Sequence, residues 1–215
     1  MSNFNELSNQ NLSGFIPALV IDYLLEKLRK KESRKLPEKQ TFDSVVMFAD
    51  ISGFTNLAEK LTKRGHEGTE LLAFTLNRYM ELLVKAIGRS GGDIFKFAGD
   101  AIIIVWPPPS DKSHLVILCR QAIQSALDIQ SKLTDFKIID EVKLSVKIGF
   151  GVGQVTIAHV GGVFQRAEYL PAGSPLTQAF ECEHLAPGGG VVIVSKQVWE
   201  KCFDYFEFED VKGHH

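Results

Sequence analysis

The sequence predicts an α+β fold in which helices pack on a mostly antiparallel β-sheet. Short apolar runs, such as residues 45–48 and 101–106, are typical of buried strands. Longer stretches, such as residues 69–87, carry apolar residues at three- and four-residue steps, which is typical of amphipathic helices. Strands and helices do not alternate strictly along the chain. We therefore expect the helices to cover one face of the sheet rather than to form a regular α/β arrangement.

The chain divides into an extension and one domain. Residues 1–41 are expected to form an N-terminal extension, with a short helix over 15–29 and a basic, solvated linker over 27–39. A single domain is expected over 42–210, and residues 213–215 are expected to be the remnant of a purification tag. Strands are predicted over 45–48, 94–98, 101–106, 144–150, 155–160, 167–172, 191–194 and 203–209. Helices are predicted over 56–63, 69–87, 114–133 and 175–185, and in a short segment capped by Ser195.

Composition limits the classes of partner and compartment. The formal net charge of −2 over 215 residues gives no general attraction to nucleic acid or to an acidic membrane surface. The basic run at 27–39 lacks interleaved aromatic residues for base stacking, which favours a linker over a nucleic-acid patch. Three cysteines without metal-ligand spacing suit a reducing compartment. No signal peptide and no apolar run of membrane-spanning length is present, so we expect a cytoplasmic protein.

Two aspartates stand beside apolar strands. Asp50 follows the run 45–48, and Asp100 lies next to Gly99, just before the run 101–106. Taken singly, each is most simply a turn aspartate. A carboxylate at the edge of an apolar strand is costly to bury alone, and two that meet there repel unless a cation lies between them. The sequence therefore predicts that both aspartates contribute to one divalent-cation site.

The surroundings of these aspartates resemble one family. Residues 48–55 read Phe-Ala-Asp-Ile-Ser-Gly-Phe-Thr, and residues 96–101 read Lys-Phe-Ala-Gly-Asp-Ala. Both stretches resemble the class III nucleotidyl cyclases, the adenylyl and guanylyl cyclase catalytic domains. The resemblance covers about residues 42–198, and it is strongest to the first catalytic half of the bicarbonate-responsive soluble adenylyl cyclases. It implies a ferredoxin-like core, in agreement with the predicted α+β class.

The resemblance also implies a reaction and a set of ligands. The ribose 3′-hydroxyl of ATP, or of GTP, attacks the α-phosphorus, and cyclic nucleotide and pyrophosphate are formed. Two divalent cations, Mg²⁺ or Mn²⁺, would be held by Asp50, Asp100 and the backbone carbonyl of Ile51. The phosphates would be bound by the backbone N–H groups of Gly53, Phe54 and Thr55. Thr55 is expected to cap the helix over 56–63.

The other half of the family's site comes from a second domain, and this chain matches that half poorly. Lys96 stands at the family's base-binding lysine. Leu170 stands where a Thr or Asp reads the base, Thr177 where an Asn orients the ribose, and Glu181 where an Arg stabilises the transition state. The resemblance thus implies a metal-binding half that needs a complementary half, either a second cyclase domain of the same chain or a homodimer mate.

Two further expectations concern the base pocket. Since Phe95 and Phe97 alternate with Lys96 along a strand, packing of the Phe pair inward would direct Lys96 to the opposite face, the family's dimer interface. The bicarbonate-responsive enzymes bind their activator with this lysine and an arginine. That arginine position falls on Phe180 here, which places bicarbonate as an activator in question.

Two rival functions are open at this point. One is a catalytically silent pseudo-cyclase that binds a nucleotide or ion and regulates a partner. Leu170, Thr177 and Glu181 favour it, and the two aspartates disfavour it. The other is a diguanylate cyclase, because residues 91–95 read Gly-Gly-Asp-Ile-Phe. That motif requires an acidic residue where Ile94 stands, so it is the weaker rival.

Overall fold

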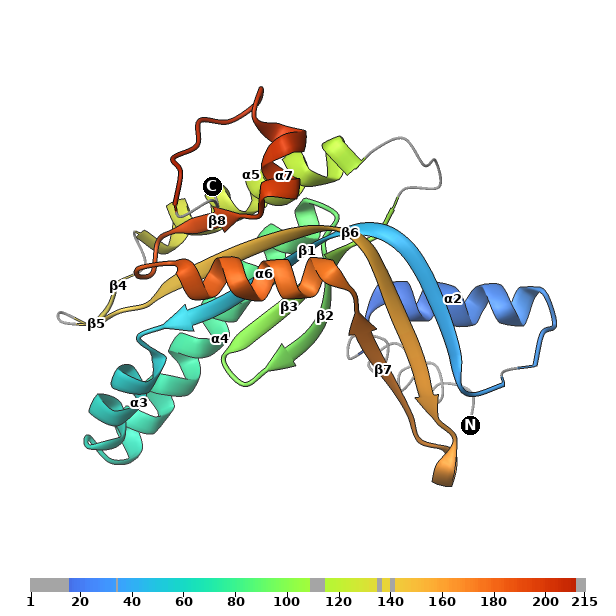
Figure 1. Cartoon of the computed structure of the whole chain (residues 1–215). Helices are drawn as coiled ribbons and strands as arrows, with labels where there is room; N and C mark the ends of the chain where they lie inside the picture. The colour runs from blue at the N-terminus through green and yellow to red at the C-terminus, as the bar shows by residue number, and fades with distance from the viewer. Residues whose placement is uncertain (1–15, 34, 109–114, 135–136, 140–141, 212–215) are drawn as a thin grey trace.

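The computed structural model describes residues 16–33, 35–108, 115–134, 137–139 and 142–211, and its centre is one curled β-sheet (Figure 1). The strands follow the order β2-β3-β1-β6-β7 with antiparallel neighbours, and β8 pairs parallel with β6. Their bounds are β1 Glu38–Ser52, β2 Asp93–Ala98, β3 Ala101–Trp106, β6 Ser145–Gly161, β7 Ala167–Ala172 and β8 Val192–Val194. A small second sheet pairs β4 Lys137–Ile139 with β5 Val142–Lys143. The predicted α+β class is confirmed.

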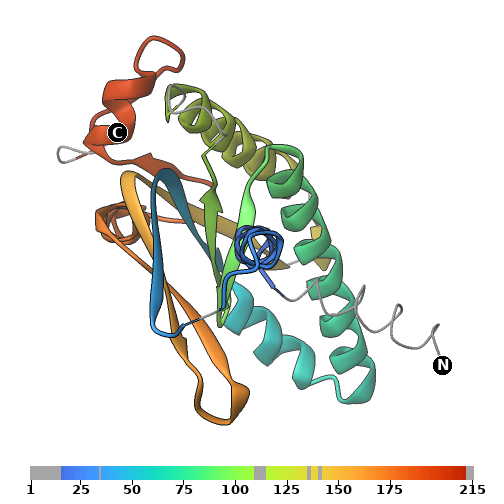
Figure 2. The same cartoon turned by 90° about the vertical axis from the view of Figure 1, so that its right-hand side faces the viewer.

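Helices cover both faces of the sheet, not one as the sequence led us to expect (Figure 2). The described helices are α2 Ala18–Arg29, α3 Phe54–Thr62, α4 His66–Arg89, α5 Leu115–Thr134, α6 Ser174–Leu185 and α7 Lys196–Cys202, with a 3₁₀ turn η1 at Val163–Gln165. The larger core joins α3, α4, α5 and α7 to one face, and the smaller joins α2 and α6 to the other. The reason lies in β1, where Val45 and Met47 face one core and Val46 faces the other. A continuous apolar strand is buried on both sides.

The strand β6 is continuous over Ser145–Gly161, where two separate strands over 144–150 and 155–160 were predicted. Two glycines of β6 lie under α6. A Cβ on Gly149 would stand 2.0 Å from the carbonyl oxygen of Ala179, and one on Gly151 would stand 2.1 Å from that of Pro175. The glycines therefore permit close packing of α6 on the strand and do not mark its end.

Three other boundaries differ from expectation. The strand β1 begins at Glu38, before the domain start predicted at residue 42, and it ends at Ser52, so Asp50 lies inside it. The strand predicted over 203–209 is absent from this described segment. Its alternating pattern arises because Phe206 and Phe208 pack against the larger core without a ladder partner. The expected tag at 213–215 lies outside the described residues.

Two acidic residues of the sheet, Asp93 and Glu38, hold the helix α2 in place. The carboxylate of Asp93, at the start of β2, accepts hydrogen bonds from the backbone N–H groups of Ala18 (3.1 Å) and Leu19 (2.8 Å). The carboxylate of Glu38 accepts one from the Tyr23 hydroxyl at 2.6 Å and forms an ion pair with Lys27 at 3.2 Å. The region predicted as a solvated linker thus contains contacts that fix α2 on the sheet.

We predict that Asp93→Ala will lower the free energy of unfolding by about 1–2 kcal/mol, because two N–H groups at the start of α2 lose their acceptor. Urea unfolding followed by circular dichroism measures the change. The control is Asp43→Ala, which removes an exposed aspartate from β1. Equal stability of the two variants would show that the Asp93 contacts contribute nothing.

Candidate active site

The ladder between β1 and β3 brings the two predicted aspartates together. Asp50 pairs with Ala101, and Asp100 is the residue before Ala101, in the turn that joins β2 to β3. Burial and the negative charge of Asp100 raise the pKa of the Asp50 carboxyl above its ordinary value. The two carboxylates are therefore close enough to repel each other.

A lysine and a glutamate that were not predicted from the sequence complete the charged group. Asp50 pairs with Lys147 in the β1–β6 ladder, so both side chains project from one face, and the positive charge of Lys147 opposes the rise in the pKa of Asp50. The ammonium of Lys147 forms an ion pair with the carboxylate of Glu183, on α6, at 3.8 Å. Burial and the charge of Asp50 raise the pKa of Glu183. Asp50 and Glu183 thus both lie near one lysine.

The chemistry of these donors fits a hard divalent cation. Carboxylate and carbonyl oxygens are the ligands that Mg²⁺ and Mn²⁺ prefer, and repulsion between Asp50 and Asp100 is relieved by a cation between them. Within the described ranges, no three His, Cys, Asp or Glu side chains are arranged to hold a metal ion by themselves. Two aspartates with the backbone carbonyl of Ile51 are consistent with that finding, because the third ligand would come from the main chain.

The helix α3 begins directly after this edge of β1. Gly53 is its N-cap residue with φ +92°, a left-handed conformation that favours glycine. Thr55 lies inside the first turn, and no side chain caps the helix, so the expected capping role of Thr55 is wrong. The first turn of a helix leaves backbone N–H groups without helical partners. Gly53, Phe54 and Thr55 therefore remain the predicted phosphate-binding groups.

Lys96 is exposed on β2 and lies on the same face as α6. It pairs with Ile103, which pairs with Phe48, so the three form a row across β2, β3 and β1. The condition that Phe95 and Phe97 both pack inward is not met, because Phe95 is 6% exposed and Phe97 is 51% exposed. The register of β2 shifts between Ile94 and Lys96, and this irregularity breaks the simple alternation.

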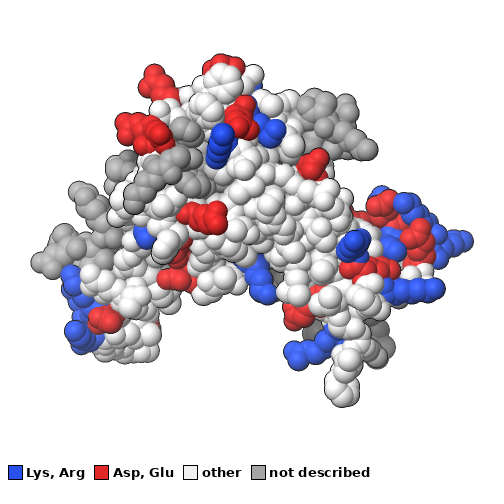
Figure 3. All heavy atoms as spheres, viewed as in Figure 1, with Lys and Arg blue, Asp and Glu red and all other residues white. Residues whose placement is uncertain are grey.

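The other residues of the predicted base pocket are exposed and do not lie beside Lys96 in the sheet. Leu170 is on β7 and Lys96 on β2, with three strands between them in the sheet order. Thr177 and Glu181 lie on the exposed side of α6. Phe180 packs edge-on against Phe48, with ring centroids 4.5 Å apart. The surface over α6 is mostly free of charge, while charged side chains gather around α2 (Figure 3).

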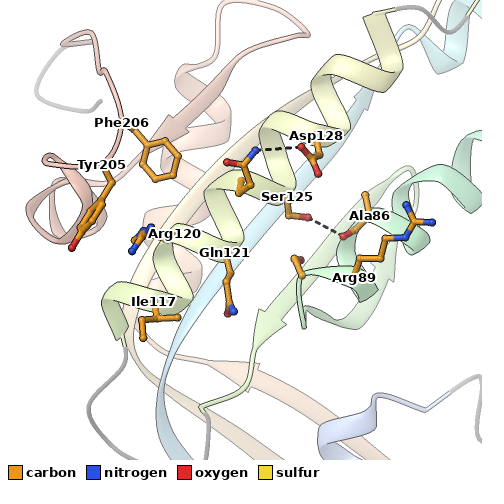
Figure 4. A pocket seen from close by; sticks show the side chains of 11 residues that line it. Ala86, Arg89, Ile117, Arg120, Gln121, Ser125, Asp128, Tyr205 and Phe206 are labelled. Atoms are coloured by element: carbon orange, nitrogen blue, oxygen red, sulfur yellow. Dashed lines mark hydrogen bonds between the residues drawn. The ribbon is translucent and has the colours of Figure 1, made fainter.

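A separate cavity of about 630 Å³ lies between α4, α5 and the C-terminal segment (Figure 4). The guanidinium of Arg120 lies over the ring of Tyr205, 4.1 Å from its centroid, and Arg89 approaches from α4. None of the predicted site residues lines this cavity.

Comparison with known proteins decides the family. Residues 37–212 match the family model described as the adenylate and guanylate cyclase catalytic domain. The chain belongs to this family. Adenylate cyclase type 10 of Rattus norvegicus is 31% identical over 172 residues, which is 79% of this cyclase-family chain and 10% of the relative. The chain thus spans about a tenth of the length of that relative.

Solved structures of this cyclase family share the fold. A bacterial light-regulated adenylyl cyclase has a TM-score of 0.68 at 20% identity, covering 93% of this chain and 55% of that one. The guanylate cyclase domain of RhGC from Catenaria anguillulae, solved in complex with GTP, has a TM-score of 0.65 at 21% identity, covering 80% and 89%. Among the described residues, no helix is both long and apolar enough to cross a membrane.

We predict that Asp100→Asn will lower the pKa of Asp50 toward its ordinary value of 3.8 in the metal-free protein, because it removes a repelling charge. Carbon-13 NMR of the carboxyl groups measures this pKa. Since the folded wild type holds the proton of Asp50 more tightly than the unfolded chain, this group costs stability as the pH rises through its folded pKa. Asp43→Asn is the control, and an unchanged Asp50 titration in Asp100→Asn would contradict the proximity of the pair.

Proposed function

We propose that this chain is the metal-binding half of a class III adenylyl cyclase, which converts ATP to 3′,5′-cyclic AMP and pyrophosphate when paired with a complementary half. The observation that carries the proposal is the meeting of Asp50 and Asp100 beside the start of α3, in a chain of the cyclase family. The preference for ATP over GTP is supported by the relative named adenylate cyclase type 10.

The residues of this chain suit the first half of the reaction. Asp50, Asp100 and the carbonyl of Ile51 would hold two divalent cations, Mg²⁺ or Mn²⁺. Bound there, the cations would lower the pKa of the attacking ribose hydroxyl and neutralise the triphosphate. The N–H groups at the start of α3 would orient the phosphates by hydrogen bonds to their oxygens.

The same chain lacks the second half of a site. A leucine at position 170 cannot hydrogen-bond to a base, and a glutamate at position 181 would repel a triphosphate. The exposed, mostly uncharged surface over α6 supports pairing with a further domain, either from the same protein or from a second copy. At the family's arginine position this face carries Phe180, which packs against Phe48. Lys96 would therefore be the cation available to bicarbonate on this face.

A catalytically silent pseudo-cyclase is the second candidate, and Leu170 and Glu181 favour it. The three cysteines are free and buried, which agrees with the cytoplasmic location that we propose.

The enzyme and the pseudo-cyclase differ in what happens when a complementary half is supplied, since only an enzyme gains turnover.

We predict that the purified chain alone will form cyclic AMP at least about a hundredfold more slowly than the same chain mixed with a complementary cyclase half, because each missing transition-state donor costs about that factor. The assay measures product from ATP with Mn²⁺. In the mixture, Asp50→Asn and Asp100→Asn should each abolish the gain, while Asp43→Asn should retain it. Full turnover by the chain alone would contradict the half-site account, and no gain with any half would favour the pseudo-cyclase.

A further inference from the structure

We propose that Glu183 is a positioning residue which holds the ammonium of Lys147 away from Asp50, and so keeps Asp50 available to a divalent cation. This inference rests on the proposed function, since it assumes that Asp50 binds the cation. It assigns a role to two residues that were identified through the register of the sheet and the packing of α6, and not through a sequence motif.

The geometry explains why Lys147 needs to be directed. Lys147 and Asp50 are direct cross-strand partners, and opposite charges in such positions attract each other. An ammonium on Asp50 would occupy the oxygens that a divalent cation requires, so it would compete with metal binding. In the described part of the chain, however, the ion pair of Lys147 within 4 Å is formed with Glu183. The ammonium of Lys147 thus pairs with Glu183 on α6 and not with its cross-strand neighbour Asp50 on β1.

The position of Glu183 is fixed by the packing of α6. Its backbone nitrogen would lie 2.4 Å from a Cβ on Gly149, so the helix touches the strand at this residue. The preceding residue, Cys182, is fully buried. The side chain of Glu183 is 12% exposed and that of Lys147 is 28% exposed, so the pair is screened less than a surface ion pair. A fixed, half-buried carboxylate can therefore outcompete Asp50 for the lysine.

The consequence for the site is a division of charges. Among the described residues, no lysine forms an ion pair with Asp50 or Asp100, which leaves their oxygens available to a cation. Lys147 stays near, where its charge can still act on an anion that approaches Asp50, since it already influences the pKa of that group. Loss of Glu183 would let the ammonium of Lys147 move to Asp50, where it would compete with the divalent cation.

The test is a double-mutant cycle in the full chain of 215 residues, with Mn²⁺ binding followed by electron paramagnetic resonance and calorimetry. Glu183→Gln should weaken Mn²⁺ binding about fivefold or more, because it releases the lysine. Lys147→Met should change the affinity little when Glu183 is present, and should strengthen it about fivefold or more in the Glu183→Gln background. This inequality is the signature of diversion, since a simple sum of charges makes the effect of Lys147→Met the same in both backgrounds.

Two controls separate this inference from other causes. Glu200→Gln removes an exposed glutamate from α7 and should leave Mn²⁺ binding unchanged. Asp50→Asn should abolish binding, and if it does not, the proposed function fails. If Asp50→Asn abolishes binding while the cycle is additive, the diversion by Glu183 is overturned and the metal site stands. Thermal unfolding of each variant identifies any loss of fold, and a weakening in Glu183→Gln that Lys147→Met does not reverse would also overturn the proposal.

Discussion

Repulsion between Asp50 and Asp100 is the constraint on which the site depends. The β1–β3 ladder fixes Asp50 opposite Ala101 and so holds two like charges at one edge of the sheet. Burial, and after it the negative charge of Asp100, raises the pKa of Asp50, so both disfavour its charged form without a counter-charge. The buried ladder supplies the stability that keeps the pair together, because the strand residues around it, such as Ala49 and Ile102, lie in the larger core. We propose that a divalent cation between the two carboxylates relieves this repulsion.

The glycines of β6 connect this edge to the rest of the molecule. Gly149 and Gly151 let α6 touch the strand, and that contact brings Glu183 to Lys147 beside the aspartates. The same helix turns Thr177 and Glu181 outward, on a surface that a second domain could cover. One packing contact therefore serves the acidic site on one side of α6 and the proposed pairing surface on the other.

Local motifs allowed the prediction of the aspartates, while long-range pairing hid their neighbours. Asp50 lies near the end of β1 and Asp100 in the turn before β3, so the apolar runs next to them in the sequence were enough to single them out. Lys147 and Glu183 meet Asp50 only through the β1–β6 ladder and the packing of α6, which no local pattern encodes. In the same way, Gly151 was left between two predicted strands, because its contact with α6 is distant in the chain. The apolar run at 45–48 did carry a signal for helices on both faces, since a half-exposed strand would alternate.

The central claim is that Asp50 and Asp100 bind divalent cations together. Crystals of the chain soaked with Mn²⁺ and a non-hydrolysable ATP analogue test it most directly, because Mn²⁺ is located by its anomalous scattering. The account predicts anomalous density within ligand distance, about 2.0–2.3 Å, of a carboxylate oxygen from each aspartate. Mn²⁺ density bound elsewhere in the chain, with both carboxylates without a metal, would contradict it.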